Sequence, residues 1–382
     1  MSKVLEHVLT KPATVAGRQP WIYSPLVDGI FILSPPLLAT MFIVSCPGLF
    51  SSASDIPIWA WVLLIVAVDV AHVYSTLFRT YFDSDELRKH TALYTLIPLL
   101  GWLGGVMLYS MGSLVFWRIL AYLAVFHFVR QQYGFMMIYR RKEKGAFSGF
   151  QWIDKATIYM ATIYPLVYWH THLPRNFSWF IQGDFFRIQS KFLDHATFLI
   201  YATCLFAYAT AESLLTFRSG KFNLPKNLLV VGTVVSWYVG IICFNGDLAF
   251  TLTNVISHGV PYMCLIWIYG HNKSALKPRE KLLPFLKART FFSAAGVPLF
   301  IGVLFLLAYF EEGLWDGFVW RDHTEVFQWF SNLPRLVSQS TLAWMVPLLA
   351  LPQITHYILD GFIWRIRGGD TEWKNIVFNP QR

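Results

Sequence analysis

Hydrophobic residues in this chain form long continuous runs, and short polar segments separate each run from the next. A helix of about 20 apolar residues can cross the ~30 Å hydrocarbon core of a bilayer. Because the runs are continuous and do not alternate with polar residues, they predict helices and not the strands of a membrane barrel. We therefore predict an all-α, polytopic membrane helical bundle. Its ten spans lie at about 29–50, 57–78, 92–111, 113–138, 152–171, 195–217, 226–245, 248–270, 290–310 and 341–364.

Prolines and polar segments mark the limits of these spans. Pro35 and Pro36 should kink or break the first span, and Pro261 should kink the eighth, because proline cannot donate a backbone hydrogen bond. We expect residues 1–28 to form a cytoplasmic N-terminal segment. The segments 172–194 and 311–340 are too polar to span but rich in aromatic residues, so we expect them to lie along the external interface. The chain then forms a single membrane-embedded domain over residues 1–382.

The composition agrees with a membrane location. Hydrophobic residues make up 55% of the chain, charged residues only 14%, and the mean hydropathy is +0.46. A soluble domain carries about 25% charged residues. The four cysteines occur singly and without a CxxC pair, so they indicate neither a disulfide framework nor a thiolate metal site.

The distribution of basic residues predicts the orientation. The net charge is +9, but the basic residues lie in short loops between spans, so we expect no nucleic-acid partner. The loops on the side of the two termini contain 22 of the 31 Lys and Arg residues, and the opposite loops contain five. By the positive-inside rule both termini are cytoplasmic. We expect a multi-pass protein of a bacterial inner (cytoplasmic) membrane.

The even-numbered spans all carry polar residues at a spacing of three or four. This spacing places the residues of each span on one face of its helix. At 1.5 Å per residue, the histidines among them lie roughly 10–20 Å from the cytoplasmic boundary. Ionisable groups at that depth normally face one another or a wet cavity, so the pattern predicts one polar site that opens to the cytoplasm. The residues are Asp69, His72 and Thr76; His127, Arg130 and Gln131; Tyr208 and Glu212; Thr251, Asn254 and His258; and Gln353, His356 and Asp360.

Imidazoles and carboxylates without sulfur suit a metal ion, and we predict one or two iron ions, with zinc or manganese as alternatives. The predicted ligands are His72, His127, His258, His356 and Glu212. Asp69 and Asp360 could orient the histidines, bind the metal directly, or pair with Arg130. Gln131 and Asn254 could orient a ligand or a bound water. Arg130 could hold an anionic head group through its planar guanidinium.

A metal in a membrane cavity suggests chemistry on a substrate that dissolves in the bilayer. Iron fits oxygen-dependent hydroxylation, desaturation or cleavage of an apolar chain, with electrons from a cytoplasmic donor, whereas zinc fits hydrolysis. The intramembrane histidines of this cytoplasm-facing polytopic chain resemble those of the integral-membrane histidine-rich non-haem iron oxygenases, such as fatty-acid desaturases, alkane hydroxylases and carotenoid oxygenases. That resemblance implies an oxidoreductase of lipid metabolism. The HxxxH and HxxHH boxes of the desaturases do not occur here.

Other functions fit the same residues. Intramembrane Asp, Glu, His and Arg also describe a proton- or ion-coupled transporter. His258 could instead act as the general base of a membrane transferase. A haem protein fits less well, since paired axial histidines would normally lie at more than one depth. His90 and His271 are expected in solvated loops, and His170, His172 and His195 lie on the external side.

Overall fold

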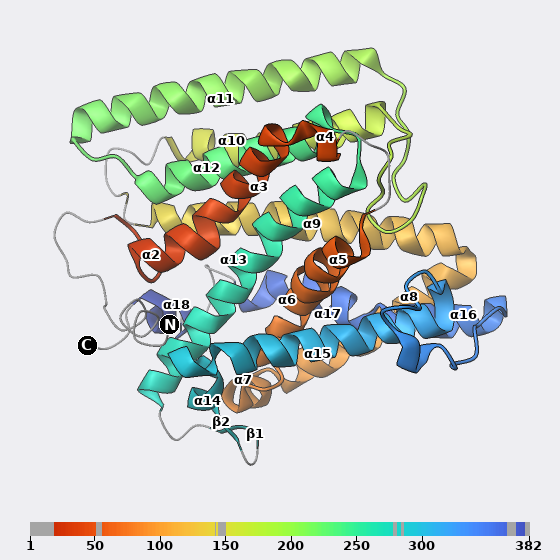
Figure 1. The fold of residues 1–382 in the computed structure, drawn as a ribbon. Helices are drawn as coiled ribbons and strands as arrows, with labels where there is room; N and C mark the ends of the chain where they lie inside the picture. The colour runs from red at the N-terminus through yellow and green to blue at the C-terminus, as the bar shows by residue number, and fades with distance from the viewer. Residues whose placement is uncertain are drawn as a thin grey trace. The chain divides into compact units, whose positions relative to one another are not determined.

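The computed structural model describes residues 19–50, 56–141, 143, 150–277, 281–283, 286–364 and 372–378. Most of the described residues are helical (Figure 1). The strands among them are β1 (Lys281–Leu283) and β2 (Leu286–Lys287), which pair antiparallel. The chain divides into two compact units: the first contains residues 57–124 and 262–382, and the second contains residues 10–56 and 125–261. The long helices α9 (Ser113–Arg140) and α13 (Asp247–Leu276) contribute residues to both units.

The first unit begins with one continuous helical span over residues 58–79, which includes the π-helical turn η2. Helix α8 packs against α16 and α17, and α15 packs against η2 and α6. The elements of this unit are α5 (Ile58–Trp61), η2 (Val62–Val70), α6 (Ala71–Ser75), η3 (Thr76–Arg79), α7 (Ser84–Lys89), α8 (Thr91–Met111), α14 (Ala288–Phe292), η6 (Ala294–Gly296), α15 (Val297–Trp315), η7 (Asp316–Trp320), η8 (Gln328–Phe330), α16 (Gln339–Leu349), α17 (Leu351–Ile363) and α18 (Glu372–Phe378).

The second unit is built around helix α10, which packs against both α11 and α12 (Figure 1). Helix α12 also packs against α3. A close backbone approach holds η5 beside α13, because a Cβ atom on Gly240 would lie only 2.0 Å from Thr253 Oγ1. The elements of this unit are α2 (Pro25–Asp28), η1 (Gly29–Leu33), α3 (Ser34–Ser45), α4 (Pro47–Phe50), α10 (Gln151–Thr171), α11 (Lys191–Ser219), α12 (Leu224–Tyr238) and η5 (Val239–Cys243).

Eight helices within the described residues are long and apolar enough to cross a membrane, and the bent pair α16–α17 makes up to nine. All ten predicted spans are helical, but α10, the predicted fifth span, is not among those that meet the criterion of length and composition. The ninth span continues through η7 to Trp320. The helix therefore extends ten residues into the segment 311–340, which the sequence placed outside the ninth span. Apolar residues continue on both sides of Glu311 and Glu312, so the helical pattern does not end there.

The prolines do not end the helices that contain them. Pro35 and Pro36 lie in the first turn of α3, directly after the π-helical turn η1, within one candidate span. Pro261 lies inside α13, which is continuous from Asp247 to Leu276. The sharp break occurs instead between α16 and α17, which meet at 44° around Ala350.

Candidate metal site

Helices α9 and α13 bring two buried histidines together. His127 Nε2 lies 3.2 Å from His258 Nε2, and the ring centroids are 4.9 Å apart. Two nitrogens bound to one tetrahedral metal at about 2.0–2.1 Å would be about 3.3 Å apart. The separation therefore fits either a direct hydrogen bond or two ligands of one ion.

The surroundings of this pair fix its orientation. The Phe128 ring stacks on the His258 ring, with centroids 3.5 Å apart and an interplanar angle of 9°. Gln131 Nε2 donates to the His258 carbonyl oxygen at 2.9 Å, and Asn254 Nδ2 donates to the Phe250 carbonyl oxygen at 3.0 Å. Gln131 Oε1 and Asn254 Oδ1 are buried acceptors without a hydrogen-bond partner in the described part of the chain. Both atoms suit a donor such as a bound water.

The loop between α10 and α11 closes the side of His258 that carries Phe128. Trp179 makes an edge contact with Phe128, with ring centroids 5.0 Å apart. Asp184 holds this loop in place by accepting backbone hydrogen bonds from Trp179 at 2.9 Å, Phe180 at 2.7 Å and Ile181 at 3.2 Å. Burial raises the pKa of the Asp184 carboxyl, and these hydrogen bonds act in the opposite direction. Aromatic side chains thus cover the His127–His258 pair on the side of this loop.

Helices α6 and α17 bring a second pair of buried histidines together. The ring centroids of His72 and His356 are 5.0 Å apart. Asp69 Oδ1 lies 3.7 Å from His72 Nδ1, and Asp360 Oδ1 lies 3.9 Å from His356 Nδ1. These distances are too long for hydrogen bonds. The two carboxylates are near the histidines, as predicted, but neither bonds directly to its neighbouring ring in this arrangement.

A chain of hydroxyl groups connects His356 to Asp360. Tyr262 donates its hydroxyl proton to Asp360 Oδ1 at 2.5 Å, so its oxygen accepts from Thr76 Oγ1 at 2.9 Å. Thr76 Oγ1 in turn accepts from His356 Nδ1 at 2.7 Å. This direction places the proton of the neutral ring on Nδ1 and the lone pair on Nε2, the tautomer that a metal ligand requires.

Four imidazoles make up the candidate metal site. Each of these buried rings offers one nitrogen, and the four nitrogens lie within 4.8 Å of one another. Within the described residues they form a group that could hold a metal ion, as the sequence predicts. Four neutral nitrogen donors without sulfur suit iron, zinc or another borderline transition metal. The residues are His72, His127, His258 and His356.

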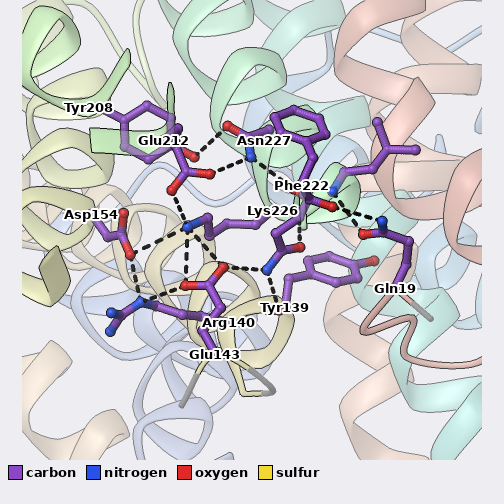
Figure 2. A network of polar contacts seen from close by, with 12 residues as sticks. Gln19, Tyr139, Arg140, Glu143, Asp154, Tyr208, Glu212, Phe222, Lys226 and Asn227 are labelled. Carbon is purple, nitrogen blue, oxygen red and sulfur yellow. Dashed lines mark hydrogen bonds and ion pairs between the residues drawn. The ribbon is translucent and has the colours of Figure 1, made fainter. Parts of the chain in front are cut away.

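Glu212 differs from its predicted role as a metal ligand. Its Oε1 lies 2.5 Å from Lys226 Nζ, and its Oε2 accepts from Asn227 Nδ2 at 2.7 Å (Figure 2). Lys226 is fully buried and also lies 3.0 Å from Glu143 Oε1. A carboxylate that neutralises a buried ammonium cannot leave it without a large cost, so Glu212 belongs to this ion network and not to the four-histidine group.

Sequence reasoning missed three residues that contact the predicted site residues. Tyr262 and Thr76 supply the hydroxyl chain described above; Thr76 was noted on the polar face but had no assigned role. Glu311, on α15, is buried and accepts a hydrogen bond from Gln353. Tyr262 follows His258 by four residues, which is the spacing that could have placed it on the same helical face.

The remaining histidines and the cysteines lie outside the group of four. His170 Nδ1 and His195 Nδ1 contact carbonyl oxygens of their own helices at 2.6 Å. His271 Nδ1 lies 2.7 Å from the Phe292 carbonyl oxygen. All four cysteines are free thiols, in agreement with the absence of a predicted disulfide framework.

Comparison of the chain with family models, with curated proteins and with solved structures gave no match.

Proposed function

We propose that this chain is a multi-pass membrane metalloenzyme in which the two histidine pairs bind iron and oxidise a lipid-like, apolar substrate. The observation that carries the proposal is the group of four buried imidazoles whose ring nitrogens lie within 4.8 Å of one another. A hydrogen bond between His127 and His258 would account for one pair alone. A shared metal accounts for both pairs, and for the tautomer that the Thr76–Tyr262–Asp360 chain imposes on His356.

The surroundings favour oxidation over hydrolysis. The Phe128 ring covers His258, and Tyr262 makes an edge contact with the His356 ring at 5.1 Å. Such an aromatic lining suits an apolar chain, whose C–H bonds do not react with water but can be oxidised at iron. In hydroxylation, one C–H bond and O₂, with two electrons and two protons, give a C–OH group and water. A soluble electron donor on the cytoplasmic side would supply the two electrons.

We place the chain in a bacterial inner membrane with both termini in the cytoplasm. The eight candidate spans, the bent pair α16–α17 and α10 together give the ten crossings that this orientation needs. The uneven distribution of basic residues, 22 on one side and five on the other, supports the same orientation.

Metal analysis of the detergent-purified protein tests the proposal. We expect iron at one or two equivalents per chain in the wild-type protein, and its loss in His127→Ala and in His356→Ala. His195→Ala is the matched control, because this histidine is exposed and its Nδ1 contacts a carbonyl oxygen of its own helix. Zinc in place of iron would overturn the redox part of the proposal. Metal-free protein that keeps its activity would overturn all of it.

The break between α16 and α17 favours a second candidate, an ion-coupled transporter. Discontinuous helices commonly form the ion sites of transporters, and this break lies six residues before His356. Metal-free protein that carries protons across proteoliposomes, with flux lost in Asp69→Asn, would establish this function. A membrane transferase would instead be metal-free, and His258→Ala alone would abolish its activity.

A further inference from the structure

Arg130 is an exposed arginine within the span formed by α9. Its Nη1 donates to the Tyr159 hydroxyl at 2.7 Å, and its guanidinium carbon lies 5.2 Å from the centre of the Tyr133 ring. The rings of Tyr133 and Tyr159 stack on each other, with centroids 5.3 Å apart. The two tyrosines therefore hold the guanidinium in one orientation, with its remaining N–H groups on an accessible surface.

Two other basic residues of this unit, Arg140 and Lys226, have carboxylate partners. Arg140 Nε lies 2.6 Å from Asp154 Oδ2, and Lys226 pairs with Glu212 and Glu143 (Figure 2). Arg130, in contrast, pairs with no carboxylate among the described residues of the second unit. A charged residue at the centre of a span costs about 2.5–3.5 kcal/mol on insertion scales. An arginine that bears this cost without a protein counter-charge is well suited to bind an anion from outside the chain.

The position of Arg130 relates this feature to the candidate metal site. Arg130 follows His127 by three residues on the same helix, a spacing that brings Cβ atoms to about 5–6 Å. It precedes Arg140, the last residue of α9, by ten residues, or about 15 Å along the helix axis. An anion at Arg130 would thus lie within the membrane depth, beside the His127–His258 pair and away from the helix end.

We propose that Arg130, Tyr133 and Tyr159 form a binding site, here called the anion seat, for the anionic group of an amphiphilic substrate. This inference rests on the proposed function and adds a substrate class to it: an acyl-chain molecule with a carboxylate or phosphate head. The guanidinium accepts a planar carboxylate or phosphate as a two-pronged donor. The Tyr159 hydroxyl accepts from Arg130, so its own proton is available to the same anion.

Ligand binding to the intact, detergent-purified protein tests the anion seat. Oleate, phosphatidylglycerol and methyl oleate are titrated against tryptophan fluorescence, for the wild type, Arg130→Gln and Tyr159→Phe. Arg218→Gln is the matched control, because Arg218 is an exposed arginine of the same unit. We expect Arg130→Gln to weaken binding of one anionic ligand by ~10–100-fold, the value of a hydrogen bond to a charged group, and Tyr159→Phe by less. Methyl oleate should bind weakly to every variant.

The outcomes distinguish a fatty carboxylate from a lipid phosphate as the ligand. They also distinguish failure of the anion seat from failure of the proposed metalloenzyme function. Preference for oleate identifies a fatty carboxylate, and preference for phosphatidylglycerol identifies a lipid phosphate. Equal binding of both anionic ligands by Arg130→Gln and the wild type overturns the anion seat, as does equal binding of oleate and its methyl ester. Arg130 is no metal ligand, so Arg130→Gln should keep the wild-type metal content. Absence of metal from all variants overturns the proposed function and leaves the anion seat standing on its own binding data.

Discussion

Thr76→Val should weaken metal binding by more than its effect on the fold explains. The substitution keeps the volume of the side chain but removes the hydroxyl that accepts from His356 Nδ1 at 2.7 Å. His356 Nδ1 then loses the acceptor that keeps its proton there, and the Nε2 lone pair is no longer favoured. Tyr262 keeps its hydrogen bond to Asp360, so the rest of the chain of hydroxyls is unaffected.

The size of the effect follows from the role of Thr76. Loss of a residue that orients a metal-bound histidine typically reduces metal affinity 10–100-fold, or by about 1.4–2.8 kcal/mol. Competition with a chelator of known affinity measures this directly, because the chelator concentration that removes half of the metal should fall by the same factor. Thr76→Ser restores the hydroxyl and should restore the affinity.

Thr80→Val is the matched control for this experiment. Thr80 is buried one turn further on, and its hydroxyl donates to the Thr76 carbonyl oxygen at 2.8 Å. Its loss should change the melting temperature by about as much as Thr76→Val does, without changing metal affinity. Equal metal affinities for wild type, Thr76→Val and Thr80→Val would refute the assigned proton position on His356.

Two further predictions concern stability. Lys226→Met should destabilise the protein by ~3–5 kcal/mol, because it removes the ammonium group that lies beside the buried carboxylates of Glu212 and Asp154. Adding Glu212→Gln to this variant should recover part of the lost stability, because it removes one of the two uncompensated charges. Thermal unfolding in detergent measures both variants, and an unchanged melting temperature for Lys226→Met would contradict the result. Gly240→Ala should cost ~1–3 kcal/mol in the same assay, since the added Cβ would meet Thr253 Oγ1, whereas Gly302→Ala meets nothing within 4 Å and should be neutral.

The helical fold could be predicted because its signal is local. Continuous apolar runs identify helices without knowledge of their neighbours, and all ten runs are helical. The end of the ninth helix could not be predicted in this way. Glu311 makes that segment look polar, yet the structure satisfies Glu311 with a hydrogen bond from Gln353, which lies 42 residues away in the chain. Polarity alone does not distinguish a solvated carboxylate from a buried one that has found a partner.

The sequence predicted only part of the candidate site, because it shows which residues share a helical face but not which residues pair between helices. The spacing of three or four residues is sufficient to place each histidine on the polar face of its helix. It does not reveal which polar residue bonds to which. Glu212 was assigned to the metal because Lys226 lies on a different helix, and only the packing of α11 and α12 shows that the two are paired. Thr76 was placed on the polar face without a role and Tyr262 was not singled out, since threonine and tyrosine in membrane helices are usually packing residues.

The two buried polar clusters differ in how their charge is balanced. Around Lys226 the protein supplies both signs, with Arg140 and Lys226 facing Glu143, Asp154 and Glu212 (Figure 2). Asp69 and Glu311 have no lysine or arginine partner within the described residues, and the nearby histidines are neutral bases when they bind metal. Glu311 is buried and Asp69 is partly exposed, and a carboxylate removed from water needs either a proton or a cation. On the proposed function the metal supplies that positive charge, so Asp69→Asn should lower the affinity for the metal. Competition with a chelator measures this affinity, and an unchanged affinity in Asp69→Asn would contradict the assignment.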